Sequence, residues 1–264
     1  MTRRALLAAL LATVLGAGSA RAVDFGNLFK GLNIVSVEQE AQIAGTFAKD
    51  VESKKRFARD PAVRQFVNEI GARLARSRRS DFPWRFRVMQ DPEVNAYNIG
   101  GGYVYVNTGL LAAARSEGEV AAVIAHEMGH QTKRHVAKTI SRQHVFQSLA
   151  AFATGGQGSQ WVQLAAGLGI TTGQLHFGRE AEREADKVMV DTMLGGGYDP
   201  RQALAMFDTL RRIQGNRGGI AFLSSHPPTK ERAASVRQRI SERRIPSGLT
   251  TDSRRFHDIK TRLQ

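Results

Sequence analysis

The sequence predicts an α+β fold that is mainly α-helical and carries one small sheet. Apolar residues recur at spacings of three and four through most of the chain, which is the period of amphipathic helices. Strand-like patterns are confined to two short stretches, residues 82–91 and 95–111. The chain has 264 residues, enough for one domain with a substantial core.

The first residues have the features of a secretory signal peptide. Arg3 and Arg4 precede a short apolar stretch over 5–18, and "ARA" at 20–22 is a small-x-small cleavage site. We therefore expect a signal peptide over 1–22, export to the periplasm, and a single mature domain over 23–264. An uncleaved membrane anchor is the alternative, although the apolar stretch is short for a span.

The chain is strongly basic and has no cysteine. Its formal net charge is +14, and +11 without residues 1–22. Such a charge is frequent in nucleic-acid-binding proteins, but export argues against a nucleic-acid partner. We expect contact with an anionic membrane surface or envelope component, or a basic surface that only faces water. Basic residues gather towards the C-terminus, where we predict a basic tail over about 245–264.

Two helices are expected at the start of the mature domain. Apolar residues recur at helical spacing over 35–53. The second helix, over 60–77, opens with Asp60 followed by Pro61, which favours a helix start because Pro lacks the N–H that the first turn leaves unsatisfied.

The two strands follow these helices. Over 82–91 the residues Trp84, Phe86 and Val88 alternate with others of the opposite face, which indicates a half-exposed strand. Over 95–111 glycines precede β-branched and aromatic residues, which indicates a turn and then a strand.

The rest of the chain is expected to be helical. Ser116 and Glu119 form a capping box in front of an apolar helix. Residues 141–178 are expected to form packed helices, or a hairpin joined by a flexible loop. The remaining predicted helices are one that begins at 179 and ends at Gly195–Gly197, one over 199–213, and one after a loop within 224–244.

The stretch "AAVIAHEMGH", residues 121–130, places ionisable side chains in an otherwise apolar helix. His126 and His130 project from one face about one turn apart, so two ring nitrogens can converge on one cation. Glu127 lies beside the first histidine and can act on a water at the same ion. This HExxH pattern is typical of a zinc site with two ligands and a general base. Two hydrogen-bonded core histidines are the alternative.

A catalytic zinc ion needs a third protein ligand, and residues 180–186 offer four acidic side chains. At about 100° per residue, Glu182 falls on the apolar face of this helix, whereas Glu180 and Glu184 fall on the side expected to face water. A carboxylate in an apolar stripe needs a cation to offset its desolvation, so Glu182 is the predicted third ligand. Asp186, one turn on, is predicted to accept a hydrogen bond from a ligand histidine, with a plain salt bridge as the alternative.

Over roughly residues 35–240 these motifs resemble those of the HtpX-like and CAAX-prenyl-protease-like zinc metalloendopeptidases, a gluzincin family, and in particular its exported BepA-like branch. "FGREAEREAD" matches the family's Ser-Arg-x-x-Glu-x-x-x-Asp helix, with Gly178 in place of the serine. "SHPPTKER" matches its His-Pro loop, and "HEMGH" is followed by His135, as is frequent in the family. "NAYNIGGGYVYVNTGLL" is similar to its substrate-binding edge strand, with Gly100 where a proline is usual.

The resemblance implies a zincin-like metallopeptidase domain that holds one Zn²⁺ per chain through His126, His130 and Glu182, with Glu127 as the general base. His226 and Arg232 would lie near the oxyanion or a substrate carbonyl. His226 could instead turn onto the zinc and block it, and a histidine in a surface loop is a further alternative.

The resemblance also implies an exposed edge strand that flanks the active-site cleft. Tyr103, Val104 and Tyr105 would bind an extended peptide through backbone hydrogen bonds. An ordinary buried strand is the alternative.

Together these features predict a zinc-dependent endopeptidase that hydrolyses misfolded or unfolded envelope proteins, a role in protein quality control. A zinc-containing chaperone-like protein and a basic envelope-binding module without proteolysis are the alternatives. The natural substrate and the oligomeric state do not follow from the sequence.

Overall fold

A three-stranded sheet forms the β part of the fold within the residues that the computed structural model describes, 33–143, 175–217 and 220–263. Its strands are β1 (Arg85–Met89), β2 (Ala96–Asn98) and β3 (Tyr103–Asn107), in the order β1–β3–β2. β3 pairs in parallel with β1 and antiparallel with β2. The prediction that residues 103–106 form an exposed edge strand is therefore wrong, because β3 has a partner on each side.

The turn between β2 and β3 requires glycine. Gly100, Gly101 and Gly102 have φ angles of 89°, 59° and 83°, in the left-handed region. A Cβ on Gly102 would also lie 2.3 Å from the carbonyl oxygen of Pro83. Proline is confined to a φ near about −65°, so it could not replace Gly100 in this turn.

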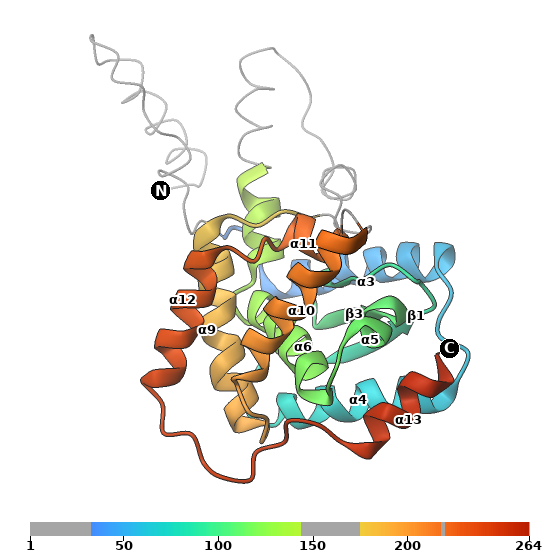
Figure 1. The fold of residues 1–264 in the computed structure, drawn as a ribbon. Coiled ribbons are helices and arrows are strands. Elements are labelled where there is room, and N and C mark those ends of the chain that lie inside the picture. The colour runs from blue at the N-terminus through green and yellow to red at the C-terminus, as the bar shows by residue number, and fades with distance from the viewer. Residues whose placement is uncertain (1–32, 144–174, 218–219, 264) are drawn as a thin grey trace, which may run out of the picture. The chain divides into compact units, whose positions relative to one another are not determined.

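The two predicted N-terminal helices are confirmed as α3 (Val37–Lys54) and α4 (Pro61–Ala75). The side chain of Ser36 accepts from the Gln39 N–H at the start of α3. Asp60 accepts from the Ala62 N–H, 2.8 Å away, at the start of α4. The apolar face of α3 packs on one side of the sheet, against Tyr97 and Tyr105, whereas α4 packs on the other side (Figure 1).

The helix that carries the HExxH pattern is α6 (Glu117–Thr132), which follows the short helix α5 (Thr108–Ala113). Residues 117–131 are all buried. Ser116 caps α6 by accepting from the Glu119 N–H, as predicted. The Glu119 carboxylate, however, accepts from the Arg115 N–H, 2.9 Å away, rather than from Ser116, so only half of the predicted capping box is present.

Helix α9 (Arg179–Gly195) lies directly against α6, and its position depends on Gly129. A Cβ on Gly129 would lie 2.6 Å from the carbonyl oxygen and 2.9 Å from the Cα of Ala185. Such distances are too short for a carbon contact. A side chain at position 129 would therefore force the two helices apart.

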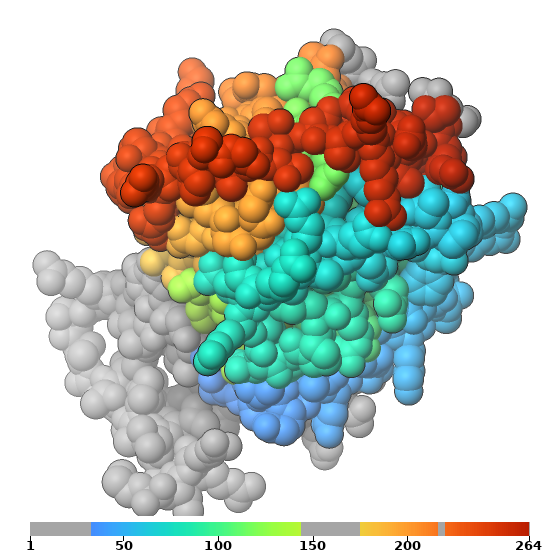
Figure 2. Space-filling view, turned by 90° about the horizontal axis from the view of Figure 1, so that it is seen from below, coloured from blue at the N-terminus to red at the C-terminus, as the bar shows by residue number. Residues whose placement is uncertain are grey.

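The C-terminal part adds α10 (Gln202–Arg217), α11 (Ala221–Ser225), α12 (Lys230–Ser241) and α13 (Arg254–Arg262). The predicted basic tail is thus not a simple tail, because α13 packs on α4 through buried Phe256 and Ile259. Phe256 lies 6.2 Å from Phe66, measured between ring centroids. Figure 2 shows this red C-terminal segment lying across the face next to the blue-green residues of α4.

Two predictions fall on parts of the chain that the structure does not describe. The signal peptide over 1–22 lies outside the described residues, and so does most of the segment 141–178. Residues 135–143 are helical. In the described part of the chain, no helix combines the length and apolarity that a membrane span needs.

Candidate metal centre

Four side chains from three segments converge in the interior. His126 and His130 come from α6, Glu182 from α9, and His226 from the C-terminal end of α11. One ligand atom from each lies within 4.8 Å of the others. The structure thus brings together the three predicted metal ligands, although they are widely separated in sequence, and it places His226 in the same group, as the predicted alternative of a histidine turned onto the metal requires.

The distances within this group are close to those around a tetrahedral ion. His126 Nε2 lies 3.1 Å from His130 Nε2 and 3.4 Å from His226 Nδ1. Glu182 Oε1 lies 3.3 Å from His130 Nε2 and 2.9 Å from His226 Nδ1. Ligand atoms bound at zinc distances to a tetrahedral ion stand roughly 3.3–3.6 Å apart. The donor set and its spacing therefore suit a metal ion of this geometry.

Glu127 is fully buried beside these ligands and is held by β2. Its Oε2 accepts from the backbone N–H of Asn98 at 3.1 Å and from the side-chain Nδ2 at 3.2 Å. Its Oε1 makes no hydrogen bond within the described residues, and His226 Nε2 lies 3.5 Å away. One carboxylate oxygen is thus fixed, and the other is left for a molecule in the site.

Asp186 and Arg232 contact the metal ligands and orient them. Asp186 Oδ1 lies 3.0 Å from His126 Nδ1, which directs Nε2 of that ring towards the metal position. Arg232 donates to Asp186 through Nε and Nη2, at 2.8 and 2.7 Å. Its Nη1 lies 2.8 Å from Glu182 Oε2. These contacts use the guanidinium to position two carboxylates, rather than to present a donor to a substrate oxyanion.

The charges in this network keep the two acidic groups ionised. Burial by itself raises the pKa of Glu182, but His226, His126 and His130 outweigh it and hold the pKa well below its usual range. Burial also opposes ionisation of Asp186, and the Arg232 guanidinium lowers the pKa of that carboxyl nevertheless. Glu182 is therefore a carboxylate that can bind a cation, and Asp186 a carboxylate that contacts Arg232 and His126.

A second chain of contacts reaches His130 from the surface. His130 Nδ1 lies 2.9 Å from His135 Nδ1, and His135 Nε2 lies 3.0 Å from Glu184 Oε2. Burial lowers the pKa of His135 to about 4, so this ring is neutral at ordinary pH. Glu184 is half-exposed on the side expected to face water, and it is also the outer end of this chain of contacts.

Aromatic rings close the metal centre. Phe177 stacks on His130, with 4.1 Å between ring centroids, and Phe222 lies 4.9 Å from His226. The ligand side chains are at most 3% exposed. A cavity of only about 10 Å³ adjoins His126, too small for a peptide. Within the described part of the chain, the ligand side chains are therefore almost fully enclosed.

The predicted substrate-binding residues lie on β3, the central strand, where Val104 is the register partner of Asn98 on β2. Tyr105 stacks on Tyr97 and contacts Glu52 of α3, while Arg85 lies over the ring of Tyr103. The strand beside Glu127 is β2, which the sequence pattern did not reveal because all three of its residues are buried and show no alternation. Asn98 was missed for the same reason, although its polar side chain in an apolar context was an available signal.

Comparison with known proteins agrees with this geometry. The chain is 31% identical over 223 residues to mitochondrial metalloendopeptidase OMA1 of Schizosaccharomyces pombe, which covers 81% of this chain and 64% of the relative. It is 28% identical over 224 residues to the beta-barrel assembly-enhancing protease of Escherichia coli, which covers 80% of this chain and 45% of the relative. The chain thus spans about half to two thirds of the length of these relatives.

A model of a known family matches most of the chain. It is described as peptidase family M48, and it covers residues 58–240. This range contains all the residues of the metal centre, from Asn98 on β2 to Arg232 on α12. The chain belongs to peptidase family M48.

Proposed function

We propose that this protein is a zinc metalloendopeptidase. The observation that carries the proposal is the buried carboxylate of Glu127 beside the ligand cluster, with Oε2 fixed by Asn98 and Oε1 without a hydrogen bond among the described residues. A metal that only stabilises the fold has no use for such a carboxylate, because an uncompensated buried charge is costly. A hydrolytic centre needs it as a base.

Each residue of the centre then has a defined task. Bound zinc would polarise the scissile carbonyl and make a bound water more acidic. Glu127 Oε1 takes a proton from the attacking water and passes it to the leaving amine. Asn98 keeps the carboxylate in the orientation for this transfer. Asp186 and Arg232 hold His126 and Glu182 in place.

We further propose that His226 occupies the open position of the metal in the resting enzyme. Its Nδ1 lies 2.9 Å from Glu182 Oε1 and its ring is buried, which supports this placement. Pro227 and Pro228 stiffen the loop behind it, so the loop moves as a unit before peptide binds. A role as an oxyanion donor is the alternative after such a movement.

The proposed substrates are unfolded or misfolded envelope proteins, and the proposed location is the periplasm. The apolar leader with its "ARA" site supports export. The Escherichia coli relative is named for beta-barrel assembly, whereas the OMA1 relative is named as mitochondrial, so location rests mainly on the leader. Because β2 is an edge strand and lies beside Glu127, we propose that the extended peptide lies along β2 instead of β3.

Glu127→Gln tests the proposed activity. The variant should keep about one zinc per chain yet lose casein and peptide hydrolysis by at least about a hundredfold, as expected for a lost general base. Metal content and hydrolysis are measured in parallel. Glu231→Gln, a matched change of an exposed glutamate on α12, should leave both unchanged. Activity that survives in Glu127→Gln would reject the hydrolytic mechanism.

A further inference from the structure

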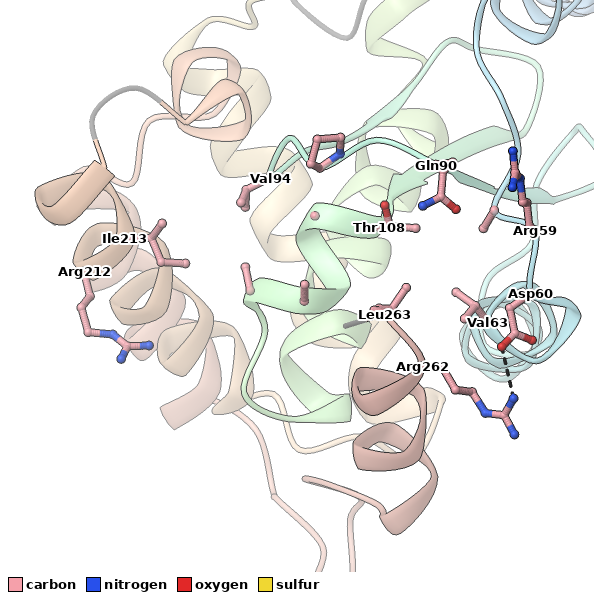
Figure 3. A pocket seen from close by; sticks show the side chains of 15 residues that line it. Arg59, Asp60, Val63, Gln90, Val94, Thr108, Arg212, Ile213, Arg262 and Leu263 are labelled. Atoms are coloured by element: carbon pink, nitrogen blue, oxygen red, sulfur yellow. Dashed lines mark hydrogen bonds and ion pairs between the residues drawn. The ribbon is translucent and has the colours of Figure 1, made fainter.

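A large cavity lies away from the metal centre. It is a groove of about 910 Å³ bounded by α5, the C-terminal ends of α10 and α13, and the segments that precede α4 and α5 (Figure 3). None of the metal-centre residues lines it. Its size is in the range of known ligand sites, which is roughly 300–1,000 Å³.

The floor of the groove is built from small and apolar side chains. Gly109, Ala112 and Ala113 of α5 form one part, and Val94, Ile213 and Leu263 form the rest. Gly109 lets the loop over 90–94 pack closely, since a Cβ there would lie 2.2 Å from the carbonyl oxygen of Pro92. The floor is therefore a preformed surface of small and aliphatic side chains.

The rim carries positive charge that the groove does not neutralise. Asp60 is the one acidic residue of the lining, and it pairs with Arg262 at 3.2 Å while it caps α4. Among the described residues, Arg59 and Arg212 have no carboxylate within ion-pair distance. Both guanidinium groups are exposed. Figure 3 shows Arg212 on one side of the groove and Arg59 on the opposite side.

We propose that this groove binds an extended polypeptide segment in which apolar residues are flanked on both sides by acidic ones. The two unpaired guanidinium groups at opposite ends provide the charge complementarity, and the floor between them takes the apolar side chains. An anionic lipid carries its charge at one end only and would leave one of the arginines unmatched. The site is separate from the metal centre, so its binding does not depend on the proposed proteolysis.

Peptide binding to the full chain tests the proposal. The chain carries Glu127→Gln to prevent cleavage, and the probe is a fluorescein-labelled peptide with aspartates at both ends and a leucine–valine core. Fluorescence anisotropy gives its Kd. Arg59→Glu with Arg212→Glu should weaken binding at least about tenfold. Arg237→Glu with Arg244→Glu makes the same change of charge outside the groove, at exposed positions, and should change Kd less than about twofold.

A second variant tests the floor. Ala112→Trp, at an exposed position of α5, fills the groove and should block the peptide without a change of charge. A peptide with lysines in place of the aspartates should not bind. Circular dichroism checks that each variant is folded.

Three outcomes would overturn the proposal: no binding of the acidic peptide to the parent chain, an equal loss in both arginine pairs, or groove-dependent binding only to phosphatidylglycerol vesicles. The first two indicate no site or a general charge effect, and the third indicates a lipid site. Failure of Glu127→Gln to lose activity would reject the proposed mechanism and leave this proposal untouched.

Discussion

Asn98 and Glu127 are joined by two hydrogen bonds to one carboxylate oxygen, one from the backbone N–H and one from the side-chain amide, at 3.1 and 3.2 Å. This pairing connects the edge strand β2 to the helix that carries the metal ligands. It also distinguishes the two oxygens of the glutamate. The oxygen that faces the site is the one without a hydrogen bond in the described structure.

Asn98→Ala should lower kcat by about tenfold while metal content and KM stay unchanged. A hydrogen bond to a charged group contributes roughly 1.5–3 kcal/mol, and the backbone donor remains in the variant. Peptide-hydrolysis kinetics with parallel metal analysis checks this prediction. Asn68→Ala, on the exposed face of α4, is the matched control. Loss of metal, or an unchanged kcat, would show that Asn98 does not position the base.

His135→Ala should weaken zinc binding by about 10- to 100-fold, because the ring fixes the orientation of His130 through a 2.9 Å contact. Glu184→Ala should act in the same direction but less strongly, since it contacts His135 and not a ligand. Competition with a chromophoric chelator measures the affinity. The exposed Glu93→Ala is the control for Glu184. Equal affinity in all three variants would mean that His135 only fills space.

His226→Ala should raise the initial rate of peptide hydrolysis by the resting enzyme, because it empties the position that the ring holds next to Glu182. The measurement is the rate on a short peptide together with metal content. A fall of about ten- to a thousandfold at constant zinc would instead assign His226 to oxyanion stabilisation. Wild-type kinetics would remove the loop from the mechanism.

Gly129→Ala should reduce the free energy of unfolding by about 1–3 kcal/mol, because its Cβ would overlap the backbone of Ala185 on α9. Zinc affinity should fall as well, since α9 carries Glu182. Gly45→Ala is the control, as a Cβ there has nothing within 4 Å and lies within helix α3, where we expect a gain of roughly 0.5–1 kcal/mol. Urea unfolding measures the change in the free energy of unfolding of both variants. Equal effects at the two glycines would contradict the close approach of α6 and α9.

The predictable parts of this protein are those that depend on local patterns. Asp60 and Pro61 identify the start of α4, and the structure places it there. The helical-face argument separates Glu182 from its neighbours, because burial on a helix follows the 3.6-residue period. The same argument places Glu184 on the side of water, where it is half-exposed, but helical angles say nothing about its contact with His135, which another helix brings to that side.

The unpredicted parts depend on pairing between distant segments. β2 has three residues, all buried, so it shows neither the length nor the alternation by which a strand is recognised. Without β2, the sequence pattern places β3 at the edge of the sheet, whereas in the structure β2 occupies that edge. The sequence of α13 predicts a basic tail because its charged residues outnumber its apolar ones. Its buried face in the structure consists of Phe256 and Ile259.

The docking of α13 on α4 also bears on the order in which the protein acquires its structure. A helix of nine residues is not stable by itself in water, so α13 forms only when Phe256 finds its place beside Phe66. Those two rings come from opposite ends of the described chain, and such distant contacts form slowly. During synthesis, the part of α4 around Phe66 that packs on α13 stays uncovered until residues 254–262 have left the ribosome. Docking of α13 on α4 is thus a late step in the folding of the described domain, and it covers apolar surface that earlier steps leave exposed.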